Sequence, residues 1–144
     1  MDKFMQAAIE EARISLSQKG IPIGSVMVKN GAVIARGHNK RVQEKDPVLH
    51  AEIDCFRNAG RIGSYKGVTL YSTLMPCYLC AGAIVQFGIK KVIAGESKTF
   101  SGAREFMESH GVAVLDLDLD ECKDLMRSFI GENPELWDED IGKL

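Results

Sequence analysis

The sequence predicts an α/β domain built on a mixed sheet of about five strands. Short β-rich segments alternate with helical segments along the chain, which is the pattern of an α/β fold. The first two strands are separated only by Asn30-Gly31, a dipeptide suited to the positive φ angles of a hairpin turn. Helices separate the later strands. A hairpin followed by right-handed helical crossovers gives a mixed sheet.

The first half of the chain contains an amphipathic helix, a hairpin and a second helix. Apolar residues recur at helical spacing from the N-terminus, and the helix is expected to end near Gly20. Residues 21–39 form the hairpin. Residues 41–48 are polar and are expected to be a loop. The helix that follows contains "LHAEIDCFRNAG" and can end at Gly60.

The second half alternates strands and helices. Three short β-rich or apolar runs are the expected strands: residues 67–74, 90–96 and 112–117. A helix between the first two has Pro76 in its first turn and Gly88 as its stop. Another helix covers residues 101–111. The chain then ends in one or two helices, broken near Gly131 and Pro134.

Length and composition indicate one cytoplasmic domain spanning residues 1–144. The formal net charge is −2, which gives no general attraction to nucleic acids or anionic membranes. Acidic residues occur early, so a signal peptide is not expected, and no apolar run is long enough to span a bilayer. In a reducing compartment the four cysteines are ligands, nucleophiles or core residues rather than disulfides.

Three residues have the spacing of a metal site. Cys77 and Cys80 are three residues apart, so a helix presents both sulfurs on one face. His50 lies at the start of its own predicted helix and can supply a third ligand. A structural zinc site needs four protein ligands, whereas a catalytic site keeps one position open. Cys55 points about 140° away from His50 on the same helix and is expected in the core.

Glu52 stands two residues after His50, where a carboxylate can serve an open zinc site. Zinc lowers the pKa of a coordinated water to about 7, and a neighbouring carboxylate can accept that proton and pass it on. Taken alone, Glu52 is better explained as an ordinary acid in the first turn of a helix. Cys122 is expected in the core, and His38 and His110 at the surface or in caps.

Two other functions fit parts of this pattern. A C-x-x-C pair alone suits a dithiol redox protein, and a zinc site closed by a further ligand suits a structural binding module. The H-x-E unit has no role in dithiol exchange, and the apolar segment after Cys80 is suited to burial. The combined H-x-E…P-C-x-x-C pattern is much more specific and is the signature of zinc deaminases.

On these residues the chain resembles the cytidine deaminase-like superfamily. The match rests on "HAE" at 50–52 and "PCYLC" at 76–80, and similarity to cytosine deaminases of the yeast type extends to "GIPIG", "RGHN", "GIKKVIAGE" and "WDEDIG". The resemblance covers nearly the whole length. It implies a three-layer α/β/α sandwich, one Zn²⁺ per subunit and a homodimer. It also implies His50, Cys77 and Cys80 as zinc ligands and Glu52 as the proton shuttle.

The same resemblance implies the residues that bind the substrate: Ile23, Asn39, Ala51, Met75, Phe100, Trp137 and Asp140. Asn39 would hold the base through its amide, and Phe100 would stack on the ring. Trp137 and Asp140 would belong to a C-terminal helix, about residues 133–144, that closes the site as a lid. Asp140 would accept a hydrogen bond from the exocyclic amine.

Two positions depart from the yeast-type sequences. Ala51 stands where those have glycine, and Met75 stands where they have serine. Both residues would contribute main-chain groups, so little change in chemistry is expected.

The expected function is therefore hydrolytic deamination of a free nucleobase, cytosine to uracil plus ammonia, in pyrimidine salvage. A small-molecule nucleobase is the expected partner. The "HAE" motif also occurs in guanine and tRNA-adenosine deaminases, so a purine base or a tRNA adenosine remains an alternative substrate. A tRNA enzyme needs a basic stripe beside its pocket. Lys90 and Lys91 are the only adjacent lysines here, and the proposed lid is acidic.

Overall fold

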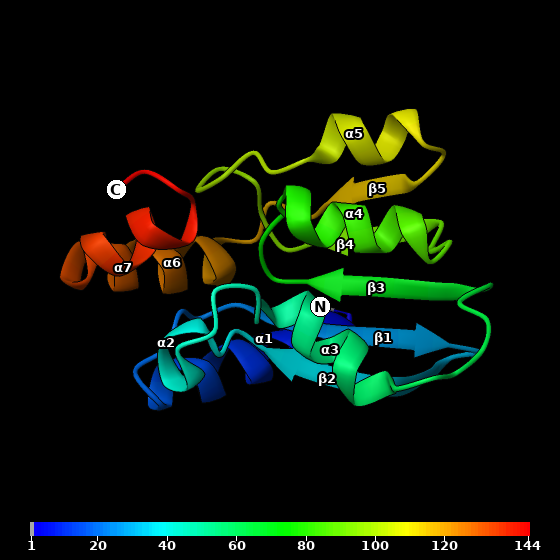
Figure 1. Cartoon of the computed structure of the whole chain (residues 1–144), viewed down its shortest axis with the longest axis horizontal. Helices are drawn as coiled ribbons and strands as arrows, with labels where there is room; N and C mark the ends of the chain where they lie inside the picture. The colour runs from blue at the N-terminus through cyan, green and yellow to red at the C-terminus, as the bar shows by residue number, and fades with distance from the viewer. Residues whose placement is uncertain (1) are drawn as a thin grey trace.

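A five-stranded sheet forms the centre of the molecule, with the strand order β2-β1-β3-β4-β5 (Figure 1). A computed structural model describes residues 2–144. The strands are β1 (Gly24–Lys29), β2 (Ala32–His38), β3 (Val68–Ser72), β4 (Lys91–Ala94) and β5 (Ala113–Asp116). The helices are α1 (Lys3–Ser17), α2 (Arg41–Glu44), α3 (Ala51–Ala59), α4 (Tyr78–Gln86), α5 (Arg104–Ser109), α6 (Asp120–Glu132) and α7 (Pro134–Asp140).

The predicted mixed sheet is confirmed. β1 pairs antiparallel with β2 across a turn in which Asn30 and Gly31 have φ angles of +53° and +75°. β1 also pairs antiparallel with β3, whereas β3, β4 and β5 run parallel to one another. The hairpin and the helical crossovers therefore arise where the turn dipeptide and the alternating pattern predict them.

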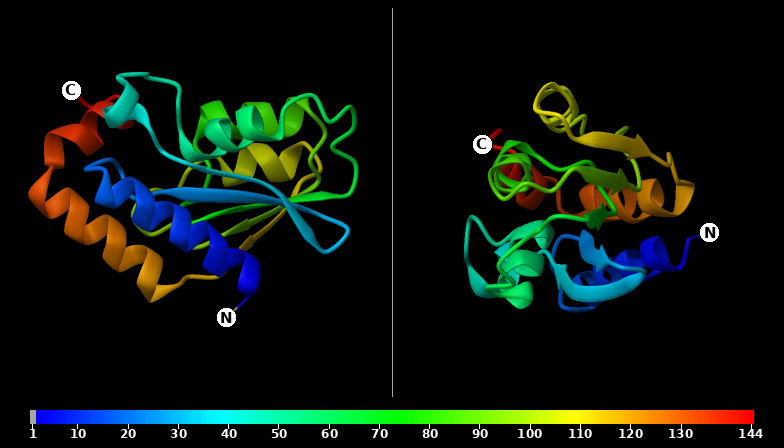
Figure 2. Two further views of the ribbon diagram at one scale, coloured as in Figure 1. Left: turned by 90° about the horizontal axis from the view of Figure 1, so that it is seen from below. Right: turned by 90° about the vertical axis from the view of Figure 1, so that its right-hand side faces the viewer.

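The molecule has three layers, as Figure 2 shows. Helices α1 and α6 cover one face of the sheet, and α3, α4 and α5 cover the other. The expected α/β/α sandwich is thus confirmed. Across residues 2–144, the structure has no helix with both the length and the apolar character that a bilayer crossing requires.

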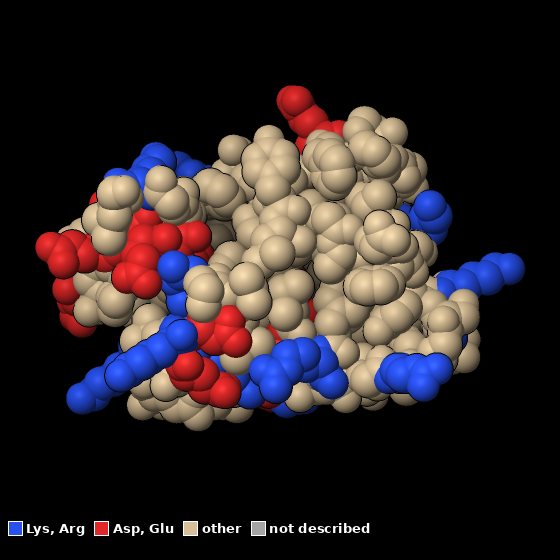
Figure 3. Space-filling view, viewed as in Figure 1, with Lys and Arg blue, Asp and Glu red and all other residues tan. Residues whose placement is uncertain are grey.

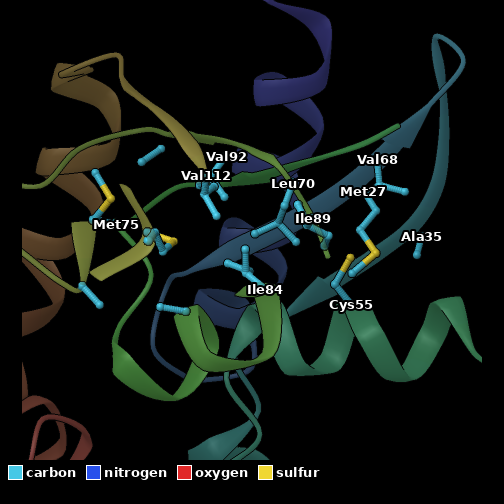
Figure 4. Packing of buried hydrophobic residues seen from close by; sticks show 14 residues of the cluster. Met27, Ala35, Cys55, Val68, Leu70, Met75, Ile84, Ile89, Val92 and Val112 are labelled. Atoms are coloured by element: carbon cyan, nitrogen blue, oxygen red, sulfur yellow. The ribbon is translucent and has the colours of Figure 1, made fainter. Parts of the chain in front are cut away.

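Alternation along the strands fills two cores. In β3, Leu70 packs toward α3 and α4, whereas its neighbour Tyr71 packs toward α1. In β4, Val92 packs on the same face as Leu70, and Ile93 packs on the same face as Tyr71. Figure 4 shows the first core, in which side chains of the sheet meet α3 and α4. Successive strand residues point to opposite faces. The strands of a sheet covered on both faces therefore have apolar residues at consecutive positions.

The strand ends bring several loops to one edge of the sheet. Ser25 at the start of β1 pairs with Ser72 at the end of β3, which in turn pairs with Ala94 at the end of β4. The segments after β3 and β4, residues 73–77 and 95–100, therefore leave the sheet side by side. Ligands of α/β proteins bind at this edge, beyond the carboxyl ends of the parallel strands.

A glycine in β2 lets α3 approach the sheet closely. A Cβ atom on Gly37 would lie 2.4 Å from the backbone N of Cys55 and 2.8 Å from the carbonyl O of Ala51. Asp54, also on α3, accepts a hydrogen bond of 3.0 Å from the backbone N–H of His38. These contacts fix the N-terminus of α3 at the ligand-binding edge.

Two local predictions were wrong. Within residues 41–48 the chain forms the single helical turn α2, whose first N–H is accepted by an asparagine side chain. Pro76 lies outside its helix, which begins at Tyr78 after the N-cap residue Cys77. The predicted break near Gly131 and Pro134 is confirmed: α6 ends at Glu132, and Pro134, which has no N–H to continue α6, begins α7.

Candidate metal centre and active-site pocket

His50, Cys77 and Cys80 meet at the sheet edge. His50 is the N-cap residue of α3, Cys77 is the N-cap residue of α4, and Cys80 is fully buried one turn further along α4. The Nδ1 atom of His50 lies 3.4 Å from Sγ of Cys77 and 3.7 Å from Sγ of Cys80. The three ligand atoms all lie within 4.8 Å of one another, so the predicted ligands form one cluster.

The cluster has the geometry of a zinc site. Sulfur and nitrogen ligands at usual zinc bond lengths in a tetrahedral shell are about 3.6 Å apart, which lies between the two observed S–N distances. Within residues 2–144, no other His, Cys, Asp or Glu joins the group. Three protein ligands fit an open, catalytic coordination shell rather than a closed structural one.

Contacts within the cluster shift the pKa values of all three side chains. A hydrogen bond from Cys80 and the neighbouring His50 lower the pKa of Cys77 to about 4 against the opposing effect of burial. The same sulfur–sulfur hydrogen bond and burial raise the pKa of Cys80 well above its usual value. Burial lowers the pKa of His50, but Asp140 and Cys77 outweigh it and raise that pKa to about 10. A zinc ion would displace the retained protons, because it binds thiolates and neutral imidazole.

Glu52 is buried next to the ligands. It lies in the first turn of α3 and is only 4% exposed. Burial raises the pKa of this carboxyl to about 7, and the negative charge of Cys77 adds to the effect. A carboxyl that titrates near neutrality can both accept and donate a proton at the working pH, as a general acid–base requires.

A cavity of about 300 Å³ opens at this cluster. Eight residues predicted from the sequence line it or reach it: Ile23, His50, Glu52, Met75, Cys77, Phe100, Trp137 and Asp140. Cys80 and Ala51 are fully buried behind the lining. Its volume is at the lower end of the range for small-molecule sites.

Helix α7 forms one side of the cavity. Its Trp137 meets Phe100, from the loop after β4, with ring centroids 6.0 Å apart and planes at 87°. Both rings belong to a hydrophobic cluster that joins α6 and α7 to the start of β1. Asp140 faces the metal ligands from the same helix, with a side chain 5% exposed and Oδ1 3.2 Å from Nε2 of His50.

Asn39 lies beside the cavity, outside its lining, and is fully buried. Its Oδ1 accepts a hydrogen bond of 2.9 Å from the backbone N–H of Arg41. Its Nδ2 has no hydrogen-bond partner among the described residues. The amide oxygen is thus used within the protein, and the amide nitrogen is left as an unpaired donor.

Five further residues line the cavity and did not emerge from the sequence: Pro47, Leu74, Tyr78, Leu79 and Ile141. Four adjoin residues that did, since Leu74, Tyr78, Leu79 and Ile141 are chain neighbours of the predicted set. Proximity to the motif was the available signal. Pro47 had none, because its place depends on how the loop containing α2 folds back.

The remaining histidines and cysteines lie away from the cluster. Cys55 and Cys122 are buried in the two cores, as expected. His38 is buried rather than on the surface, since its Nδ1 lies 2.9 Å from Oε1 of Glu11 on α1. His110 is in an exposed setting at the end of α5.

Known proteins have sequences similar to this one. The family model described as the cytidine and deoxycytidylate deaminase zinc-binding region matches residues 1–96. A cytosine deaminase of Candida albicans is 43% identical over 144 residues, which cover 98% of this chain and 96% of that protein. A tRNA-specific adenosine deaminase of Streptococcus pyogenes is 36% identical over 144 residues, covering 92% of this chain and 91% of the relative.

Solved structures share the fold. One, from a study of tRNA:A34 deaminases that edit the wobble position, has a TM-score of 0.77 and 32% identity, and covers 85% of this chain and 98% of its own. A guanine deaminase from Nitrosomonas europaea has a TM-score of 0.78 at 19% identity, covering 89% of this chain and 83% of its own. The second likeness concerns the fold alone. With its metal-ligand cluster inside the matched region and relatives aligned over nearly its whole length, the chain belongs to the cytidine and deoxycytidylate deaminase family of hydrolytic enzymes.

Proposed function

We propose that this deaminase acts on a free nucleobase and converts cytosine to uracil and ammonia. The observation that carries the proposal is the small cavity beside His50 and Glu52, bounded by Trp137 and Asp140 of α7. We assign α7 the role of a lid over a single domain. A lid that packs an aromatic ring and a carboxylate against the cavity favours a compact planar base over a nucleotide embedded in a longer chain.

The donor set fits Zn²⁺, with His50, Cys77 and Cys80 as its ligands and one ion per subunit. When bound, zinc would supply the activation of water at neutral pH. Glu52 would take a proton from that water and deliver it to the ring nitrogen beside the reacting carbon. It would then pass a second proton to the departing amine, so that water and cytosine yield uracil and ammonia.

The other residues of the cavity would bind and orient the base. The free Nδ2 of Asn39 can donate to a carbonyl or ring nitrogen. Phe100 and Trp137, which stand nearly perpendicular, offer a face and an edge to a planar ring. Asp140 can accept from the exocyclic amine. Ile23 would be an apolar wall, while main-chain groups of Ala51 and Met75 would complete the contacts.

A tRNA adenosine is the second candidate substrate, because the tRNA-specific adenosine deaminase of Streptococcus pyogenes aligns with most of the chain. A purine base is a third. Figure 3 shows acidic residues gathered over the part of the molecule that contains α6 and α7, which favours a small base over tRNA, and lysines and arginines along the edge that contains α2 and α3. Phosphates need a basic surface beside the pocket.

One substrate panel tests these alternatives. The zinc-loaded protein is incubated separately with cytosine, cytidine, guanine, adenine and an anticodon stem-loop, and released ammonia is measured. We expect release from cytosine. Release from guanine, adenine or the stem-loop without release from cytosine would replace the proposed substrate by the one that reacts.

We also propose a homodimer, in keeping with an intracellular enzyme of pyrimidine salvage. Tyr78 and Phe87 at the two ends of α4 are 71% and 53% exposed, and Leu79 between them is 43% exposed. Figure 3 shows that the surface over α4 and α5 is mostly uncharged. In a two-fold contact each patch meets itself, so an uncharged apolar patch avoids like-charge repulsion and suits a second copy of this chain.

A further inference from the structure

Arg41, the first residue of α2, is largely buried beside α7. Its side chain is 16% exposed. The Nη1 atom donates a hydrogen bond of 2.6 Å to the carbonyl O of Pro47, and Nη2 lies 3.4 Å from Oε1 of Glu139. A guanidinium is costly to bury without partners, so the contacts are those of a paired charge. They join α2 and the loop after it to α7.

The same guanidinium faces Asp140. Its Nε lies 3.9 Å from Oδ1 of Asp140 and is buried without a hydrogen-bond partner among the described residues. That separation exceeds an ordinary N–H···O distance by about 1 Å, so the contact is an ion pair rather than a hydrogen bond. The same Oδ1 lies 3.2 Å from Nε2 of His50, so the carboxylate of Asp140 lies between the imidazole and the guanidinium.

The backbone of Arg41 contacts the second polar residue that we assign to the base. Its N–H donates to Oδ1 of Asn39 at 2.9 Å, and this hydrogen bond fixes the amide with its oxygen toward the backbone of Arg41. An N–H donor must meet the amide oxygen, so the unpaired Nδ2 is left as the group that can bind a ligand. One residue therefore contacts both of the polar side chains that we assign to the base.

We propose that Arg41 is a positioning residue for the deamination site: its backbone N–H orients the amide of Asn39, and its guanidinium holds Asp140 over the cavity. The inference rests on the proposed function, because the proposed function assigns Asn39 and Asp140 to the binding of a base. Arg41 itself touches no reacting atom. It acts by fixing the geometry of the two residues that we assign to the base.

The test compares Arg41→Met and Arg41→Lys with the wild-type protein, all loaded with zinc. Arg41→Met keeps the apolar stem and removes the charge. We expect its kcat/KM for cytosine to fall roughly 10- to 100-fold, the usual cost of a small misplacement of binding groups. Arg41→Lys keeps the charge but cannot contact Pro47, Glu139 and Asp140 together, so its kcat/KM should fall between the two.

Two further variants serve as controls. Arg127→Met makes the same replacement at an exposed arginine that pairs within α6, and should leave kcat/KM unchanged. Glu139→Gln removes one partner of Arg41 but leaves Asp140, and should lower kcat/KM less than Arg41→Met does. Zinc content and melting temperature are measured for every variant, since a purely structural role would change those quantities and leave kcat/KM per bound zinc unchanged.

Trp137 provides a binding readout, because it is the only tryptophan in the chain and lies on α7. Its fluorescence is followed while uracil is added. We expect the midpoint to move to a higher uracil concentration in Arg41→Met. Wild-type kcat/KM and an unmoved midpoint in both Arg41 variants would overturn the inference. If the wild-type protein deaminates another base instead of cytosine, the proposed substrate fails, and the ratios between variants on that base still test Arg41.

Discussion

Oδ1 of Asp140 lies 3.2 Å from Nε2 of His50, the ring nitrogen opposite the one that faces Cys77 and Cys80. Helix α7 therefore contacts His50 at the ring nitrogen that faces away from the two cysteines. A carboxylate on the outer nitrogen of a ligating histidine fixes the orientation of the ring and raises its basicity. The proposed lid and the candidate metal centre are thus joined through one imidazole.

We expect Asp140→Asn to weaken zinc binding. Loss of such an outer carboxylate typically costs roughly 10- to 100-fold in metal affinity or activity. Competition with a chelator of known affinity measures the first quantity, and ammonia release measures the second. Glu135→Gln, at an exposed position of the same helix, is the matched control and should change neither. Unaltered zinc affinity in Asp140→Asn would show that the contact with His50 has no effect on the metal.

Glu52→Gln should fold and bind zinc but lose most of its activity. The substitution keeps the size of a fully buried side chain and removes the group that moves protons. General acid–base catalysis contributes about 10²–10⁴ to a rate, so ammonia release should fall by at least that factor. Zinc content and circular dichroism provide the controls. Turnover close to that of the wild-type protein would remove Glu52 from the mechanism.

Thiol reactivity should depend on zinc. Burial raises the pKa of both Cys55 and Cys122 to about 12, so these thiols should stay unreactive while the protein is folded. After chelator treatment the low-pKa thiol of Cys77 should react rapidly at pH 7, whereas Cys80 retains its proton.

Titration with a thiol reagent should therefore detect one fast group in the chelated protein and none in the zinc-loaded protein. Cys77→Ser should abolish the fast phase. A fast reaction that persists in this variant would assign the reactive thiol elsewhere.

Gly37→Ala should disturb the packing of α3. The new methyl group would overlap the backbone at Cys55 and Ala51, which cannot move as a flexible side chain can. We expect the free energy of unfolding to fall by about 1–3 kcal/mol, as for other overpacked sites, with some loss of bound zinc. Gly82→Ala, where a Cβ meets nothing within 4 Å, is the control and should be neutral or stabilising in α4. Denaturant unfolding compares them.

Charge placed on the α4 patch should separate the proposed dimer. In Tyr78→Glu and Phe87→Glu, a two-fold contact would bring like charges together in a desolvated interface. Analytical ultracentrifugation should detect dimers for the wild-type protein and monomers for these variants. Phe87→Glu is the cleaner test, because Phe87 does not line the cavity. A wild-type protein that sediments as a monomer would refute the proposed dimer.

The strand and helix order could be predicted because it rests on local signals. The turn at Asn30-Gly31 needs positive φ angles that few dipeptides tolerate, and the structure has them. Short elements escaped prediction: α2 is a single turn whose first N–H bonds to Asn39, a contact that exists only once β2 has delivered that residue. His38 was misplaced for the same reason, since Glu11 lies far from it in the sequence.

The sequence by itself determined the chemistry of this protein. Residue types and spacing within two short segments specify the candidate ligands His50, Cys77 and Cys80 and their neighbour Glu52, because metal-ligand preference and helical periodicity are local properties. Only the tertiary structure decided how distant segments complete the site. The contacts of Asp140 with His50 and Arg41 join residues 90 and 99 positions apart, and such contacts depend on the packing of α7 against the sheet edge, which no local pattern encodes.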